Sequence, residues 1–208
     1  MLSRREVSQA VDRGRLGRAR FCLIADDCWG ADVYEHLNRS YNTPFVGLFV
    51  KAEHYLRLLG DLESYLAQPL GFRDELGESG DVRYPVGVLG GDVEIDFLHY
   101  PSQEDAATAW SRRVARVDLD RLAVKFKAPP QPPGGEQIER FLGLPFERKV
   151  AFSIAPAPGV VHVPNWTWDR AFAETQRVFD VVAWLKGTPP RRPGRGRLIY
   201  DSSATGVV

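Results

Sequence analysis

The sequence predicts an α/β fold, with a mainly parallel sheet covered by helices on both faces, one hairpin and a single domain over residues 1–187. Residues 21–25 are apolar at every position, which is typical of a strand buried on both faces. Similar runs alternate with helical patterns along the chain, as in proteins built from strand–helix–strand units. A chain of 208 residues is long enough to bury the core that such a fold needs.

The first half of the chain contains signals for three helices and two strands. Ser3-Arg4-Arg5-Glu6 has the capping-box pattern and predicts a first helix that ends near Gly17. The next elements are expected as strand 21–25, helix 31–37, strand 45–50 and helix 53–65 with a break near Asp61.

The second half is expected to begin with a polar loop and a hairpin. Residues 71–80 are loop-like, and the Gly90-Gly91 turn separates strand 86–89 from strand 93–100. The later elements are expected as a helix from Ser102 to about Arg116, strand 122–126, helix 136–142, strand 150–154 and helix 168–185. Residues 188–208 are rich in Pro, Arg and Gly, and we expect them to form a mobile basic tail.

Composition and charge narrow the class of function. The 27 Lys and Arg residues balance the 27 Asp and Glu residues, so nucleic acid is an unlikely partner. An extended strand would hold Cys22 and Cys28 too far apart for a disulfide, and free thiols are typical of a reducing compartment. The N-terminal residues lack the apolar stretch of a signal peptide, and no stretch reaches the length of a membrane span. We therefore expect a cytoplasmic protein without a membrane span.

The loop after the first strand is the predicted site, because ligands of open α/β sheets bind beyond the carboxyl ends of the strands. Cys28 would lie at the start of a helix, where free N–H groups favour a thiolate and could hold an oxyanion. Asp26 and Asp27 oppose this, since adjacent negative charge disfavours a thiolate. The alternative is a cysteine that packs as a small apolar residue. Trp29 is either a stacking surface for a sugar or a core residue that fixes the turn.

Several short motifs, in order along the chain, together resemble one protein family. They are Cys28-Trp29-Gly30, the segment 41–48, Tyr84-Pro85-Val86-Gly87, Phe97-Leu98-His99-Tyr100, Trp110-Ser111-Arg112-Arg113 and Val124-Lys125-Phe126. Over about residues 20–185 the chain is similar to the bacterial domain-of-unknown-function family 1919 (DUF1919), whose members are often described as exopolysaccharide biosynthesis proteins. The resemblance implies a role in surface-glycan assembly or in tailoring a sugar-containing natural product. The family pattern has two asparagines where this chain has Asp26 and Asp27.

His99 and Asp96 are candidates for acid–base chemistry near the end of the predicted strand 93–100. A histidine at a strand end is well placed to act as a base. Regular alternation puts the two side chains on opposite faces, so a bulge or the strand end would be needed for Asp96 to orient His99. The alternative for His99 is a hydrogen-bonded packing role beside aromatic residues.

Carboxylates at Asp92, Glu94 and Asp96 share the other face of that strand. They indicate either an edge strand with a solvated face or the wall of a site, because unpaired buried charges are costly. In a site, Glu94 and Asp96 could hold Mg²⁺ or Mn²⁺ through oxygen ligands.

A basic helical face is the candidate phosphate contact. Trp110, Arg113 and Arg116 recur at three-residue steps, and Arg112 with Arg113 could clamp the phosphate of a donor. The alternative is a solvated face with Trp110 packed inward. The predicted substrate-binding set is Asp27, Trp29, Asn42, Arg112 and Arg113.

The leading functional hypothesis is a transferase acting on a glycan or a glycosylated small molecule. In it a Cys28 thiolate accepts an acyl group from an activated, phosphate-bearing donor, and no cofactor is required. His99 would serve as the base, with Asp96 as its partner.

Two other functions are consistent with the same sequence. One is a glycosyltransferase that requires Mg²⁺ or Mn²⁺ at Glu94 and Asp96, with Cys28 in a structural role. The other is a non-catalytic glycan-binding or scaffolding protein that uses the aromatic residues Trp29, Tyr41 and Trp166.

Overall fold

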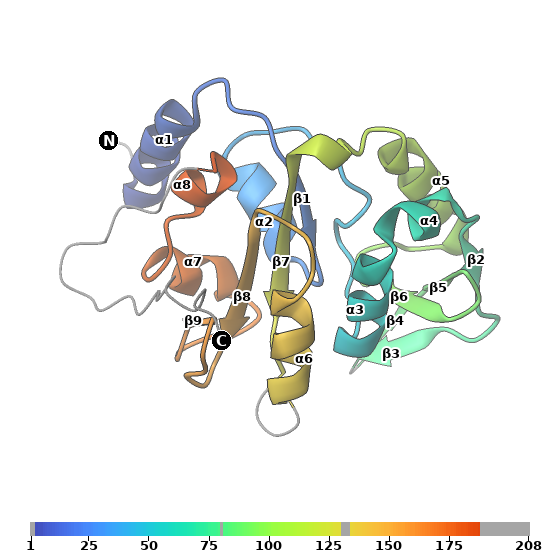
Figure 1. The fold of residues 1–208 in the computed structure, drawn as a ribbon. Coiled ribbons are helices and arrows are strands. Elements are labelled where there is room, and N and C mark those ends of the chain that lie inside the picture. Colours follow the sequence, from blue (N-terminus) through green and yellow to red (C-terminus); the bar gives the residue numbers. More distant parts are fainter. Residues whose placement is uncertain (1–2, 80, 130–133, 188–208) are drawn as a thin grey trace.

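Four parallel strands form the central sheet of the computed structural model, which describes residues 3–79, 81–129 and 134–187 (Figure 1). In spatial order they are β1 (Cys22–Ala25), β7 (Leu122–Lys127), β8 (Lys149–Ser153) and β9 (Val161–His162). Every pairing within this sheet is parallel, with Cys22 opposite Leu122 and Val124 opposite Lys149. The parallel sheet predicted from the apolar runs is therefore confirmed.

Helices cover both faces of this sheet, as the sequence predicts. Side chains alternate across the strands, so that Ile24 and Val124 enter one core while Leu23 and Ala123 enter the other. The first face is covered by α3 (Ala52–Gly60) and α6 (Gly134–Leu142), and the second by α1 (Arg4–Leu16), α2 (Trp29–His36), α7 (Ala171–Gln176) and α8 (Val181–Leu185) (Figure 1).

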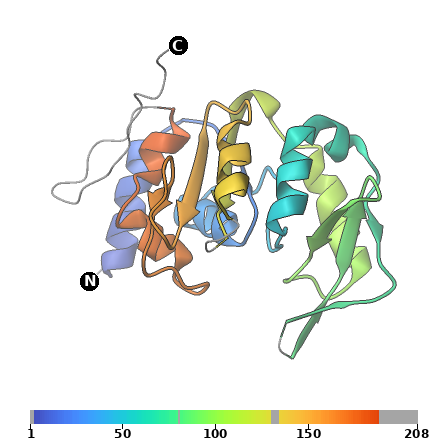
Figure 2. The same ribbon diagram turned by 60° about the horizontal axis from the view of Figure 1, so that its bottom comes forward.

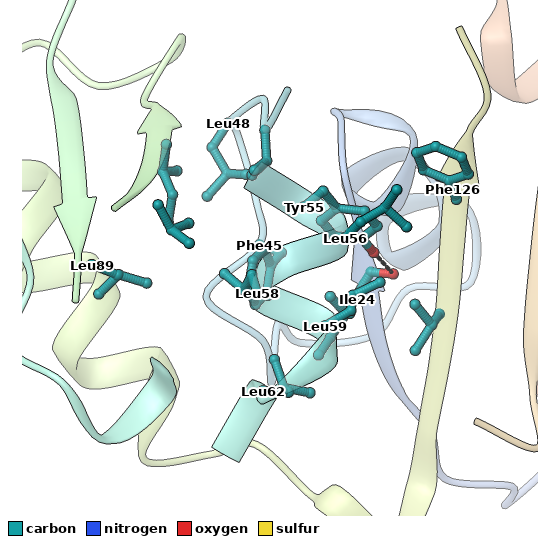
Figure 3. Packing of buried hydrophobic residues seen from close by; sticks show 14 of the residues in the cluster. Ile24, Phe45, Leu48, Tyr55, Leu56, Leu58, Leu59, Leu62, Leu89 and Phe126 are labelled. Atoms are coloured by element: carbon teal, nitrogen blue, oxygen red, sulfur yellow. Dashed lines mark hydrogen bonds between the residues drawn. The ribbon is translucent and has the colours of Figure 1, made fainter. Parts of the chain in front are cut away.

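The first core is organised around α3, with Tyr55 on the side of Ile24 and Phe126 and Leu58 on the side of Leu89 (Figure 3). Leu58 and Leu59 are buried within it. The Tyr55 hydroxyl lies 3.1 Å from the carbonyl oxygen of Ile24 and 2.9 Å from that of Lys125. A buried tyrosine needs such partners, and these two fix α3 against β1 and β7 together.

The long connection from β1 to β7 contains a smaller antiparallel sheet on the far side of α3 (Figures 1 and 2). This sheet consists of β2 (Gly71–Phe72), β5 (Val86–Leu89) and β6 (Val93–Asp96), and β3 (Gly77–Ser79) pairs with β4 (Val82–Tyr84) beside it. The connection also contains α4 (Leu62–Ala67), α5 (Gln103–Val114) and the 3₁₀ turn η1 (Leu119–Arg121). Leu89 and Val93 share one hydrophobic core with Val124 and Phe126, so both sheets belong to a single domain.

The hairpin and the helix break are confirmed. Strands β5 and β6 are antiparallel, and Gly90 and Gly91 adopt φ angles of 60° and 83°, which glycine tolerates best. The helix expected over 53–65 is divided at Asp61 into α3 and α4.

The predicted strand at 45–50 is wrong. Gly47 has a φ of 71°, and the segment makes a single bridge, between Phe49 and Asp96. Its apolar side chains, among them Phe45 and Leu48, are buried in the first core, although its backbone forms no strand ladder. A short apolar run indicates burial, and burial does not by itself require strand geometry.

The single helix predicted at 168–185 is also wrong, because the chain forms α7 and α8 with a turn between them. Asp180 explains the division, since its Oδ1 accepts the Ala183 N–H at 3.0 Å and so caps a new helix. The loop predicted at 71–80 contains the short strands β2 and β3 instead. The predicted tail at 188–208 lies outside the described residues.

Candidate functional site

Side chains from separate parts of the chain meet beyond the carboxyl ends of β1 and β7. Asp26, Asp27 and Cys28 follow β1, and Lys127 is the last residue of β7. The segment before α3 closes against them, since the Val50 N–H donates to the carbonyl oxygen of Asp26 at 2.8 Å. This edge of an open α/β sheet is where ligands bind, so we treat it as the candidate site.

A buried lysine holds two carboxylates at this edge. The Lys125 ammonium lies 2.9 Å from Oδ1 of Asp26 and 2.6 Å from Oδ2 of Asp27, and the three side chains are 0%, 3% and 3% exposed. Oδ2 of Asp26 accepts the backbone N–H of Lys127 at 2.9 Å. Burial raises the pKa of Asp26 to about 6, against the opposing charge of Lys125. This network ties the ends of β1 and β7 to each other.

Asp27 also orients the start of α2. Its Oδ1 accepts the backbone N–H of Trp29 at 3.0 Å, as aspartates that precede helices often do. Its Oδ2 forms the ion pair with Lys125 and receives no hydrogen bond from the described part of the chain. Both oxygens are therefore turned into the protein, so Asp27 does not present the open substrate contact that the sequence suggested.

Cys28 is half-buried beside the segment that precedes α3. Its Sγ lies 3.9 Å from the carbonyl oxygen of Leu48. Burial, and then the charges of Asp27 and Asp32, raise the pKa of the Cys28 thiol to about 11, with Lys125 acting in the opposite direction. The resting side chain is a neutral thiol, so the helix start does not suffice to make it a thiolate.

Trp29 is a core residue. It is 1% exposed, and its indole N–H donates to Oγ1 of Thr175 at 2.8 Å. Its ring lies 5.4 Å from that of Phe152 and 5.9 Å from that of Phe172, measured between centroids. Packing against β8 and α7 covers its faces, which is the core role that the sequence offered as the alternative to sugar stacking.

Two tryptophan rings contact the ammonium of Lys127, and a phenylalanine packs against one of them. We call this set the aromatic–lysine cluster; it consists of Lys127, Trp166, Trp168 and Phe49. The Lys127 ammonium lies 3.8 Å from the ring centroid of Trp168 and 5.4 Å from that of Trp166. Phe49 meets Trp168 edge-on at 5.9 Å. Trp168 is 62% exposed. Burial, and then the charge of Lys125, lower the pKa of Lys127, against the attraction of Asp27.

The structure places His99 on the surface and Asp96 inside. Strand β6 ends at Asp96, so His99 lies beyond it, on a turn where its N–H donates to the carbonyl oxygen of Gly47 at 3.1 Å. Among the described residues no hydrogen bond joins the His99 side chain to Cys28 or Asp96. Burial raises the pKa of Asp96, and Glu94 adds to the shift.

β6 is an edge strand, as the carboxylate face suggests. Glu94 forms an ion pair with Arg73, and its backbone N–H donates to Nδ1 of His54 at 2.8 Å. Within the described ranges no three His, Cys, Asp or Glu side chains are grouped as metal ligands. Glu94 and Asp96 thus do not form a group of three metal ligands with His54 or with another such side chain in those ranges.

Asn42 lies at the opposite end of β1 from Cys28. It donates to the carbonyl oxygen of Phe21 at 2.8 Å, just before β1, whereas Cys28 comes after it. β1 is four residues long, about 13 Å at 3.3 Å per residue, so Asn42 and Cys28 are not brought together. Arg113 lies over the Tyr41 ring at 5.2 Å and donates to the Tyr100 hydroxyl, and Arg112 is exposed on the same helix, α5.

A groove of about 480 Å³ lies away from this edge, between α1, α7 and α8. Its polar groups are largely occupied by one another, since Nε2 of His36 lies 2.9 Å from Oδ2 of Asp12 and Arg15 pairs with Asp180. We place the candidate site at the carboxyl edge, where the loop that contains Cys28 adjoins the end of β7 and the exposed Trp168 contacts the ammonium of Lys127.

Lys127 and Trp168 are the residues that sequence reasoning missed as site residues. In the sequence Lys125 and Lys127 alternate with Phe126, a pattern that indicates a basic strand face. Lys127 lies at the carboxyl end of a buried parallel strand, whereas Lys125 lies inside it. That position was the signal that could have marked Lys127, and not Lys125, as a site residue.

The fold defines an α/β protein with a candidate site at the carboxyl end of its parallel sheet. The family model described as a domain of unknown function, DUF1919, matches residues 2–186, and the chain belongs to this family. A protein of Haemophilus influenzae named only as uncharacterized is 35% identical over 136 residues, which are 65% of this chain and 63% of that protein. The chain thus aligns with less than two thirds of that relative's length. None of the described helices is long and apolar enough to cross a membrane.

Proposed function

We propose that the protein is a transferase acting on a glycan or a glycosylated small molecule, with its site at the carboxyl edge of the parallel sheet. The observation that supports this most is the exposed Trp168 beside Lys127, next to the loop that contains Cys28. Sugar rings stack on exposed tryptophan faces through their C–H groups, and the indole supplies a large rigid surface. The family resemblance to proteins of polysaccharide biosynthesis points to the same class of substrate.

In its acyl-transfer form, Cys28 is the nucleophile. A base removes the thiol proton, the sulfur attacks the carbonyl carbon of the donor, and the leaving group departs with the bonding electrons. A glycan hydroxyl then attacks the thioester carbon, the C–S bond breaks as the ester forms, and the released thiolate takes up the proton that the hydroxyl loses. Because burial and Asp27 keep the resting thiol protonated, this form requires substrate binding to bring a base to Cys28.

The first experiment is an assay of purified protein with acetyl-coenzyme A and UDP-glucose as donors and methyl glycosides as acceptors, read by mass spectrometry. Acetylated acceptor, lost in Cys28→Ser but kept in Cys22→Ala, would support acyl transfer through Cys28. Glucosylated acceptor that survives Cys28→Ser and disappears with EDTA would favour the metal-dependent glycosyltransferase instead.

A non-catalytic glycan-binding protein is the second candidate, because the aromatic–lysine cluster can bind a sugar without any transfer. Saturable saccharide binding without product from either donor would select it. The absence of both saccharide binding and transfer would refute the glycan-directed function. We further propose that the protein acts in the cytoplasm, where Cys22 and Cys28, both free, would remain reduced.

A further inference from the structure

We propose that Lys127 and Trp168 form a subsite for an anionic sugar, in which Trp168 stacks on the ring and the Lys127 ammonium binds a phosphate or carboxylate attached to it. The sugar part of this inference rests on the proposed function, and the anionic part rests on the contacts of Lys127. The subsite lies at the carboxyl edge and does not involve Arg112 or Arg113.

The two lysines of β7 differ in what they face. Lys125 is fully buried and pairs with both Asp26 and Asp27. Lys127 is half-buried, and its ammonium forms no ion pair within the described part of the chain. Its contacts are the faces of Trp166 and Trp168. Partial burial of an ammonium without a paired anion costs free energy. Binding of an anion at Lys127 would offset that cost.

Asp26 and Asp27 attract Lys127, but neither forms an ion pair with its ammonium within the described part of the chain. Asp26 and Asp27 are 2% and 3% exposed and share Lys125, so their oxygens point inward. Oδ2 of Asp26 instead accepts the backbone N–H of Lys127, which fixes the end of β7 while leaving its side chain to the cluster. Lys127 is thus the less buried of the two β7 lysines, and its ammonium is the one that no carboxylate pairs with among the described residues.

Trp168 is the part of the subsite that would contact the ring of the ligand. Trp168 is 62% exposed, which is unusual for so large an apolar side chain, and Phe49 supports it edge-on. With the ammonium 3.8 Å from its ring centroid, an anion bound to Lys127 would lie beside the indole rather than far from it. A ring that carries the anion one or two bonds away could then contact Trp168.

The test is a titration of intrinsic tryptophan fluorescence, with isothermal calorimetry as the check, using four probes. They are glucose 1-phosphate, glucuronate, neutral methyl glucoside and inorganic phosphate. Binding of glucose 1-phosphate only would identify a sugar phosphate, and binding of glucuronate only would identify a sugar acid. The variants are Lys127→Met, Lys127→Arg and Trp168→Ala. The matched control is Lys186→Met, which replaces the lysine at the carboxyl end of α8.

We expect one of the two anionic sugars to bind, and Lys127→Met to weaken it about tenfold or more, since a charge-assisted hydrogen bond is lost. Lys127→Arg should retain most of the affinity, Trp168→Ala should reduce it, and Lys186→Met should leave it unchanged. Circular dichroism of each variant checks that the fold is retained.

Equal binding of methyl glucoside, or an affinity within twofold of wild type in Lys127→Met, would overturn the inference while leaving the proposed function in place. Binding of inorganic phosphate with the same affinity as glucose 1-phosphate would also overturn it, because the sugar would then contribute nothing. If none of the saccharides binds, the proposed function fails together with the inference.

Discussion

The Lys125 ammonium lies 2.6 Å from Oδ2 of Asp27, and the two side chains are 0% and 3% exposed. Asp27 belongs to the loop after β1 and Lys125 to β7, so this ion pair joins two neighbouring parallel strands at the end where the candidate site lies. Buried ion pairs add little net stability, yet removing one partner leaves an uncompensated charge. The pair therefore determines where Cys28 and Lys127 are held.

Replacing Lys125 should be strongly destabilising. Lys125→Met leaves Asp26 and Asp27 buried without a cation, and we expect the free energy of unfolding to fall by about 3–5 kcal/mol. Urea denaturation followed by circular dichroism measures it. Lys127→Met is the matched control and should cost much less, because the Lys127 ammonium forms no ion pair among the described residues and the variant keeps the backbone N–H that Asp26 accepts. Equal losses in the two variants would contradict this account of the edge.

Asp26 should make stability depend on pH. Its pKa of about 6 in the folded protein exceeds the unfolded value of about 3.9, so the native state binds the proton more tightly. The free energy of unfolding should therefore fall as the pH rises from about 4 to about 6. In Asp26→Asn this contribution to the slope should vanish, even if the variant is less stable overall. A wild-type slope that persists unchanged in Asp26→Asn would show that another group causes it.

The parallel sheet was predictable because a strand buried on both faces needs apolar side chains at successive positions, and residues 21–25 show such a run. The segment 45–50 is also apolar, but its backbone turns at Gly47 and it makes a single bridge. The prediction of one helix at 168–185 failed for a related reason, since a helical pattern can continue across a turn that Asp180 caps. Hydrophobic pattern thus indicated burial correctly, whereas a backbone turn and a helix cap decided the element type.

The site was only partly predictable. Proximity to the carboxyl end of the first strand follows from the fold class, and it led to Asp27 and Cys28. The burial of Lys125 could not be inferred, because a lysine inside a strand ordinarily indicates a solvated face. Trp168 lies 41 positions after Lys127 in the sequence, so their contact depends on how the chain returns after β9.

The hydrogen bond between Trp29 and Thr175 should be important for stability. Thr175 is 0% exposed, and Thr175→Val would leave the indole N–H of Trp29 without its acceptor. We expect the variant to lose about 1–3 kcal/mol of unfolding free energy. Thr175→Ser keeps the hydroxyl and should lose less, which a comparison of urea midpoints would reveal. A valine variant as stable as the serine variant would mean that the indole finds another acceptor.

The reactivity of Cys28 is the last prediction, and it bears on the acyl-transfer form of the proposed function. With a thiol pKa of about 11, alkylation by iodoacetamide in a Cys22→Ala background should be slow at pH 7 and should still be rising above pH 9. Asp27→Asn should move the profile to lower pH, because Asp27 is one of the charges that disfavour the thiolate. A profile that levels off below about pH 8.5, the value for an ordinary thiol, would show an activated nucleophile. It would then make Cys28 the first residue to test for a covalent acyl intermediate.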